Sequence, residues 1–257
     1  MHPFRVFAPI LLLPAALAGA AAPGLGLADG EALTYRVSWA ILPGAGEITV
    51  TAKAVSDSAG QPRLRVLTAT STRGLAHLLL PFNARAESQF DPATGRLDYL
   101  AESSSTRGKH GSHTVRFDYG RRCATYVEAN APPRTLDLPP GLPVDLINCL
   151  VRARTWGLLP GGTQDALVLF EDDLYLLTIH ALGYEEISTP LGDFRALVLE
   201  PRMEKAPPQG MFKRGSTVKV WIAQDARRLP VRFKVDFKIG SGVATLVAYR
   251  PPALAAK

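Results

Sequence analysis

Two histidines three residues apart are the first candidates for chemistry. His110 and His113 are separated by Gly-Ser, and across a turn two imidazoles at this spacing can bind one metal ion. No further histidine, cysteine or acid follows at a spacing typical of zinc sites. The acidic stretch 171–173 offers oxygen atoms to calcium, but it lacks the alternating ligands of a calcium-binding loop. We therefore predict no metal site, and interpret these residues as exposed hairpin histidines and a solvated turn.

Residues suited to covalent or cofactor chemistry lack the surroundings that they need. No Gly-x-Ser-x-Gly motif is present, and the serine run 103–105 ends a predicted strand. The glycine-rich stretch 24–30 resembles a phosphate-binding loop, but it precedes a strand and opens no helix. We predict no catalytic residue and no cofactor. A hydrolase assembled from distant residues is a third hypothesis for the function, with Asp145 and Asp225 as the acids to test first.

The stretch 219–238 gathers an acid, two adjacent arginines, a tryptophan and a proline. Its alternating pattern predicts two strands joined by a turn at 224–228. Asp225 is suited to accept backbone N–H groups in that turn, and Pro230 is tolerated at the start of a strand. Because each polar residue has a structural role, we predict a hairpin here rather than an active site.

Alternation of apolar and polar residues dominates the chain and predicts strands. The exception begins at Pro143, where apolar residues recur at helical spacing up to Gly157; a shorter helix is predicted within 72–80. The predicted fold class is mainly all-β: a strongly curved antiparallel sheet or open barrel with one or two short helices, or alternatively two stacked β domains. The predicted strands are 33–41, 47–55, 63–71, 84–90, 96–104, 113–119, 123–128, 166–170, 174–182, 184–188, 194–200, 217–223, 230–239 and 243–249.

The first 22 residues have the pattern of a secretory signal peptide. A short region with Arg5 precedes an apolar run and then small residues, so we expect cleavage after Ala20 or Ala22, with an uncleaved anchor as the alternative. No later stretch reaches 18 apolar residues, so we expect no transmembrane segment after signal cleavage. The predicted organisation is a signal peptide at 1–22, a linker at 23–32, a single β domain at 33–250 and a tail at 251–257, in a periplasmic or secreted protein.

The charge pattern argues against nucleic acid as a partner. The chain has 29 Lys and Arg against 23 Asp and Glu, a formal net charge of +6. The basic residues are spread out and often alternate with apolar ones, which is typical of outward strand faces. Cys123 and Cys149 form either a disulfide, closing a loop of about 26 residues, or two buried free thiols.

Four stretches, in this order, carry a resemblance to a known family. They are Tyr35-Arg36-Val37-Ser38-Trp39 with 44–46, Pro143-Val144-Asp145-Leu146 with Arg152 and Arg154, Thr189-Pro190-Leu191-Gly192-Asp193-Phe194, and Val220-Trp221-Ile222 with Asp225, 228–231 and 238–240. In these stretches, which span residues 35 to 240, the chain resembles the bacterial exported family called domain of unknown function 3108. The resemblance implies a secreted, mostly β envelope protein without an established activity. The C-terminal third is also similar to periplasmic lipoprotein carriers, as an analogy of fold.

The predicted function is binding. Concave sheets lined by aromatic and branched side chains form apolar pockets, so we expect a non-enzymatic protein that binds an apolar or amphipathic ligand, such as a lipid or an acylated peptide. Basic strand faces would favour an anionic headgroup. The alternative is an envelope structural or assembly factor that contacts envelope proteins through exposed edge strands. The predicted ligand-binding residues are Trp39, Phe82, Leu146, Trp156, Trp221 and Phe233.

Overall fold

One sheet organises the protein. The computed structural model describes residues 24–208, 212, 215–237 and 240–253; the predicted signal peptide lies outside them. In these residues 15 strands pair in the order β8-β7-β6-β5-β4-β3-β2-β1-β15-β14-β13-β12-β11-β10-β9, antiparallel except between β9 and β10. The strands are β1 (Ala32–Trp39), β2 (Leu42–Ser56), β3 (Pro62–Thr72), β4 (Phe82–Phe90), β5 (Leu97–Thr106), β6 (Lys109–Asp118), β7 (Cys123–Glu128), β8 (Arg134–Asp137), β9 (Val144–Asp145), β10 (Thr163–Phe170), β11 (Asp173–Thr189), β12 (Gly192–Arg202), β13 (Thr217–Ala223), β14 (Pro230–Phe237) and β15 (Gly240–Arg250).

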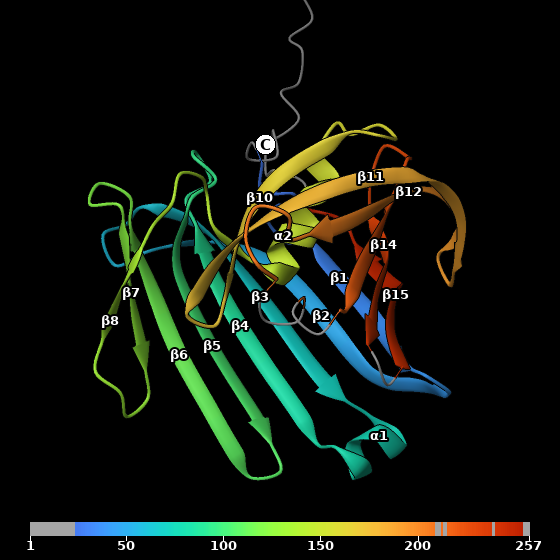
Figure 1. Ribbon diagram of the computed structural model, residues 1–257, viewed down its shortest axis with the longest axis horizontal. Helices are drawn as coiled ribbons and strands as arrows, with labels where there is room; N and C mark the ends of the chain where they lie inside the picture. Colours follow the sequence, from blue (N-terminus) through green and yellow to red (C-terminus); the bar gives the residue numbers. More distant parts are fainter. Residues whose placement is uncertain (1–23, 209–211, 213–214, 238–239, 254–257) are drawn as a thin grey trace, which may run out of the picture.

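The sheet is strongly curved and stays open (Figure 1). Strand β1 pairs with β2 on one side and with β15 on the other. The edge strands β8 and β9 follow one another in the chain, but they are not neighbours in the sheet. The helices are α1 (Gly74–Leu79) and α2 (Leu146–Arg152), and α2 continues as the 3-10 turn η1 (Ala153–Thr155). The predicted fold class, a curved antiparallel sheet with one or two short helices, is therefore confirmed.

Strand β11 is longer than the sequence pattern indicates. It runs unbroken for 17 residues, where the alternation predicts separate strands at 174–182 and 184–188. The register against β12 shifts between Ala181 and Gly183. An irregularity of this kind interrupts the alternation without ending the strand, because one extra residue moves the following side chains to the other face.

The apolar core lies between the concave face of the sheet and α2, which sits inside the curve (Figure 1). Leu33 and Tyr35 of β1 are fully buried, and so is Val151 of α2. The Tyr35 hydroxyl donates to the carbonyl of Pro230 at 2.9 Å, and its ring lies 4.9 Å from that of Phe233. Removal of apolar surface from water contributes roughly 25 cal/mol per Å², so the buried residues of α2 stabilise the curved sheet that encloses them.

Arginine side chains fasten α2 to the sheet. Arg152 donates to the carbonyl of Gly95 at 2.8 Å, and Arg154 lies 2.7 Å from the Glu31 carboxylate. Arg228, in the turn between β13 and β14, donates to the carbonyls of Arg154 and Trp156. Its φ of 48° is uncommon for a long side chain, and these bonds hold it there. The stretch 219–238 forms the predicted hairpin, and its turn anchors the end of the helix.

Candidate functional site

A cleft of about 660 Å³ opens on the concave side of strands β3 to β7. Its floor is the sheet, and its roof is the start of α2 together with the turn between β10 and β11. A second hollow of about 690 Å³ continues along the same strands toward the end where Asn83 and Ser105 lie. Together they form a trough, which we call the cleft.

Strand register determines which side chains form the floor. Residues that are directly opposite in paired strands share one face of a sheet. Two rows of inward residues cross the strands and form the floor. The first row lies nearer to α2, and the second row lies farther from it. The first row is Thr68, Ala86, Glu102, His113 and Glu128, and the second is Thr70, Ala84, Ser104 and Gly111.

The same face is apolar where α2 covers it. One row closer to the helix, Val66, Leu100 and Val115 are 2%, 1% and 0% exposed. On β3, β5 and β6 the change from branched apolar residues to polar ones therefore happens within a single step of two residues, whereas β4 places the buried Ser88 in the row nearer the helix. This change ends the packed core and leaves the cleft unfilled.

Asp145 stands at the boundary between the core and the cleft. It is the N-cap of α2, and its carboxylate accepts the backbone N–H of Asn148 at 2.9 Å. The Ser88 hydroxyl of β4 donates to the same carboxylate at 2.9 Å. Asp145 is 5% exposed, so these bonds compensate for the loss of water around a buried polar group. Its role is to position the first turn of the helix over the cleft.

Glu102 and His113 are the ionisable pair of the floor. The Nε2 atom of His113 lies 3.4 Å from the Glu102 carboxylate, and it has no hydrogen-bond partner among the described residues. Burial, followed by the nearby negative charges of Asp145 and Glu171, raises the pKa of Glu102 to about 7. Burial also lowers the pKa of His113. At neutral pH the floor therefore offers a neutral imidazole and a carboxyl group close to half-protonation.

The roof of the cleft is mostly apolar. Leu146 and Ile147 of α2 and Leu169 and Phe170 of β10 line it, and Phe170 is 41% exposed. Beyond Phe170, the turn at 171–172 joins β10 to β11. Asp172 in this turn forms an ion pair with Arg134 of the edge strand β8. That ion pair links the edge strand β8 to the turn between β10 and β11 across the cleft.

The candidate metal ligands of the sequence do not come together in the structure. In the part of the chain that the structure describes, no three His, Cys, Asp or Glu side chains lie close enough together to hold an ion. His110 and His113 both belong to strand β6 rather than to a turn. An odd separation along a strand points side chains to opposite faces, so the two imidazoles do not meet.

The acids Asp145 and Asp225 are separated in the structure. Asp145 caps the start of α2. Asp225 accepts the backbone N–H groups of Arg227 and Arg228 in the turn that is bonded to the carbonyls beyond the end of the helix. The two carboxylates therefore sit near opposite ends of α2 and do not converge on a common point.

The six predicted ligand-binding residues are dispersed. Leu146 lines the cleft, and Phe82 lies at the start of β4. Trp221 and Phe233 are only 6% and 7% exposed in the core, where the Trp221 indole donates to Glu185 at 2.8 Å. Trp156 packs against the core margin, and Trp39 contacts Phe237 at a ring distance of 5.3 Å. Cys123 and Cys149 are free thiols, so the disulfide alternative is not formed in the structure; burial raises the pKa of Cys149 to about 12.

Sequence reasoning missed Glu102 and the floor of the cleft. The detectable signal is the inward face of residues 97–106, which changes from Leu100 to Glu102 and Ser104 within one alternating strand. Polarity on the face expected to be buried marks a place where the core stops. The serine run by itself indicates only the polar end of a strand.

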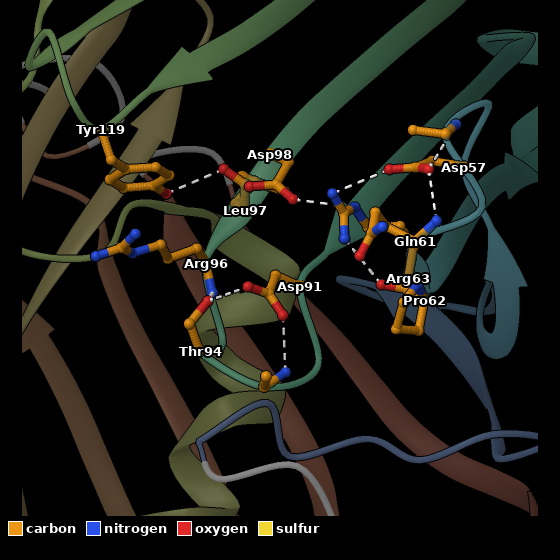
Figure 2. A network of polar contacts seen from close by, with 12 residues as sticks. Asp57, Gln61, Pro62, Arg63, Asp91, Thr94, Arg96, Leu97, Asp98 and Tyr119 are labelled. Atoms are coloured by element: carbon orange, nitrogen blue, oxygen red, sulfur yellow. Dashed lines mark hydrogen bonds and ion pairs between the residues drawn. The ribbon is translucent and has the colours of Figure 1, made fainter.

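A second polar cluster lies at the other end of the same strands (Figure 2). Arg63 of β3 contacts Asp57 at 3.0 Å and Asp98 at 3.1 Å. The Tyr119 hydroxyl donates to the carbonyl of Leu97 at 3.0 Å, and burial is the main reason why its pKa rises to about 12. In contrast to the Nε2 atom of His113, these groups have hydrogen-bond or ion-pair partners within the described part of the protein.

The fold and the cleft together define a class: an open, barrel-like protein whose curved antiparallel sheet encloses one short helix. Over residues 34–247 the chain matches the family described as "Protein of unknown function (DUF3108)". Because the match covers most of its length, the chain belongs to the DUF3108 family, and the resemblance inferred from its motifs is confirmed. Curated protein sequences give no match.

Solved structures include a protein with the same fold. A beta-barrel-like protein of domain of unknown function DUF1849 from Brucella abortus has a TM-score of 0.53 and 9% identity, covering 88% of this chain and 100% of that one. A protein described as exported, with a YmcC-like fold, from Bacteroides fragilis has a TM-score of 0.32 and 12% identity, covering 86% and 96%. A protein described as a lipoprotein from Parabacteroides distasonis has a TM-score of 0.31 and 8% identity, covering 86% and 95%. Only the first likeness is high enough to support a shared fold.

Proposed function

We propose that this protein is a periplasmic or secreted binding protein whose cleft takes an amphipathic ligand, such as a lipid or an acylated molecule. The location rests on the signal-peptide pattern of residues 1–22. In the described residues no helix is long and apolar enough to cross a membrane. The cleft has the size of ordinary small-molecule sites, which are about 300–1,000 Å³.

The two sides of the cleft suit the two parts of such a ligand. The roof presents Leu146, Ile147 and Phe170 to an apolar chain. The floor presents hydroxyl groups and the Glu102 carboxyl group to a polar part. The acids there outnumber the basic groups, and Arg134 is already paired with Asp172. A headgroup that donates hydrogen bonds, through hydroxyl or amine groups, therefore fits better than the anionic headgroup expected from the sequence.

The observation that carries the proposal is the Glu102 and His113 pair. Buried polar atoms in folded proteins almost always have hydrogen-bond partners. The buried Nε2 atom of His113 has none among the described residues, although the His113 side chain lines the cleft. Because an unsatisfied buried polar atom is costly, a ligand group that bonds to this pair would compensate for that cost.

Native mass spectrometry of protein purified from the periplasm, with lipid extraction of the same sample, tests the proposal. We expect a bound amphipathic species. We also expect delipidated protein to bind a pyrene-labelled monoacylglycerol more tightly than a pyrene-labelled fatty acid, because the latter adds a negative charge near Glu102.

Two variants locate the binding site. Ser104→Trp fills the floor and should weaken binding by at least about tenfold, whereas Ala101→Trp, on the opposite face of β5 and outside both hollows, should leave the affinity within about twofold. Protein that carries no amphipathic species and binds neither probe would overturn the proposal. Equal losses in the two variants would place binding elsewhere on the molecule.

Glu102 also supports a second candidate, hydrolysis of the bound ligand. A carboxyl group with a pKa of about 7 is suited to exchange protons at neutral pH. Under this hypothesis Glu102→Gln should retain ligand binding and lose product formation by at least about a hundredfold. Unchanged ligand after prolonged incubation with the unmodified protein would exclude it.

A further inference from the structure

Large apolar side chains are exposed at the end of the sheet that carries α1. Ile41, in the turn between β1 and β2, is 93% exposed, and Leu75, Leu78 and Leu79 of α1 are 67%, 78% and 65% exposed. No residue of α1 is buried. In Figure 1 this helix projects from the end of β3 and β4, beside the tip of β2. We call Ile41, Leu75, Leu78 and Leu79, together with Leu80 (51% exposed), the leucine rim.

Polar contacts hold the leucine rim in place. The Arg73 backbone N–H donates to the carbonyl of Ala45 at 2.8 Å, and the Arg73 guanidinium pairs with Glu47. The Thr72 hydroxyl donates to the carbonyl of Leu80 at 2.9 Å, and Arg107 donates to the carbonyl of Leu79 at 2.7 Å. The helix is therefore fixed through its backbone while its leucines stay in solvent. Packing against the protein's own core does not account for them.

Basic residues border the leucine rim. The segments that carry or contact the leucine rim, 40–47, 72–82 and 105–110, contain Arg73, Arg107 and Lys109 against the single acid Glu47. Glu47 is neutralised by Arg73. Apolar side chains surrounded by net positive charge are complementary to a bilayer surface that contains anionic lipids.

Two aromatic residues lie at the same end of the molecule as the leucine rim. Trp39 at the end of β1 and Phe237 at the end of β14 lie beside each other, and Phe237 is 36% exposed. The backbone N–H of Ala40, which follows Trp39, bonds to the carbonyl of Ser241, so both rings lie next to the turn with Ile41. Tryptophan is enriched at the interface between water and lipid.

We propose that the leucine rim docks the protein on the surface of a membrane containing anionic lipid. Monomeric proteins rarely expose contiguous apolar surface without a binding role. The rim consists of projecting side chains on a turn and a single short helix, and the most exposed of them stand clear of the surface on nearly all sides. Such a projection inserts between lipids, whereas a protein interface places its anchoring side chains in packed pockets.

Membrane docking does not depend on the proposed ligand. It gives that ligand a route, however, because the second hollow is lined by Thr70, Ala84 and Gly111, which belong to the row of the floor nearer the rim end of the strands. A lipid that leaves a docked membrane would meet this end of the cleft first.

Vesicle sedimentation tests the docking surface. The full chain is expressed and exported, and all variants share the same N-terminus, as checked by mass spectrometry. We expect the protein to sediment with vesicles of phosphatidylglycerol and phosphatidylcholine, and at least about tenfold less with phosphatidylcholine alone. The double variant Leu78→Glu and Leu79→Glu should lower binding by at least about tenfold. The double variant Arg107→Glu and Lys109→Glu should remove the preference for phosphatidylglycerol.

Matched controls distinguish docking by the leucine rim from a general effect of adding charge or filling the cleft. Leu159→Glu replaces a leucine that is 68% exposed on the loop before β10, and it should bind vesicles like the unmodified protein. Ser104→Trp should also bind vesicles normally, so failure of the ligand proposal would not affect this result. Absence of vesicle binding, or equal binding by the Leu78→Glu and Leu79→Glu variant, would overturn the proposal. A dimer that this variant dissociates, without vesicle binding, would identify the rim as a contact between copies instead.

Discussion

The two polar clusters on strands β3 to β6 differ in how completely the protein satisfies them. At one end, Arg63 lies between Asp57 and Asp98, in the network of Figure 2. Toward the other end, Glu102 and His113 face the cleft, and the Nε2 atom of His113 has no partner in the described part of the chain. Both clusters belong to the same strands, so sheet geometry does not explain the difference. The charged groups of the first cluster pair with one another, whereas the second cluster leaves polar groups available to a ligand.

This difference shows how polar residues in a β protein can be sorted into structural and functional ones. Where two charged side chains of the protein pair with each other, removing one of them leaves the other uncompensated and destabilises the fold. A partly buried carboxyl group without a neutralising partner lowers stability at neutral pH, which the pKa of about 7 at Glu102 records. Three substitutions test this contrast, with expected effects that decrease from the first to the third.

Asp145→Ala should have the largest effect on stability, because Asp145 lies where the packed core meets the cleft. The change removes the acceptor of the Asn148 N–H and of the Ser88 hydroxyl, both of which are buried. We expect the free energy of unfolding to fall by about 3 kcal/mol, as measured by urea denaturation. Asp145→Ser keeps a short oxygen at the helix cap and should lose clearly less. Equal losses in the two variants would show that capping contributes little.

Arg63→Ala should destabilise the network of Figure 2. It leaves Asp57 and Asp98 half-buried without their shared cation, and we expect a loss of about 1–2 kcal/mol in the free energy of unfolding. The control is Arg65→Ala on the same strand, because Arg65 has no ion pair among the described residues. If the network does not contribute to stability, Arg63→Ala and Arg65→Ala will have the same unfolding midpoint.

Glu102→Gln should have the smallest effect and the opposite sign. The pKa of this carboxyl group rises from 4.5 to about 7 in the folded protein, so the folded state retains the proton more strongly than the unfolded chain. The unmodified protein therefore loses stability as the pH rises from about 4.5 to about 7, and the loss is complete above that range. After a discount for partial exposure, the variant should be more stable by about 1 kcal/mol at pH 8 and unchanged at pH 4.

Thermal unfolding at several pH values measures this difference. A stability gap that stays constant from pH 4 to pH 8 would contradict the raised pKa of Glu102. A variant that is less stable than the unmodified protein at pH 8 would show that the charged carboxylate has a partner after all.

The sequence predicted the architecture well because period-2 alternation directly reports which strand face is buried. Tyr35 and Phe233 illustrate this, since both lie on faces that the pattern marks as apolar, and both are buried. The helix at 146–152 was predictable from its change of period. The order of the strands in the sheet, with β1 beside β15, could not be predicted from local sequence patterns. Strands far apart in the sequence pair because of the arrangement of the whole sheet.

The floor of the cleft could be predicted only in part. Large aromatic residues were expected to line a pocket. Trp221 and Phe233 instead pack within the core, because burying large apolar side chains is favourable wherever space allows. What remains for a ligand is the surface that the core does not use, which is small and polar, such as Ala86 and Ser104. Such residues carry no distinctive motif, and only the register between strands gathers them into one surface.

The pairing of β1 with β15 has a consequence for how the chain folds. β1 has two neighbours in the sheet, and one of them is the last strand in the described sequence. During synthesis, and during any passage across a membrane, β1 emerges first and one of its edges stays unsatisfied until β15 arrives. Pairing over more than 200 residues is slow because a long loop must close. The half-formed sheet would therefore expose an open strand edge for most of that time, and an open strand edge is a site where chains aggregate before folding is complete.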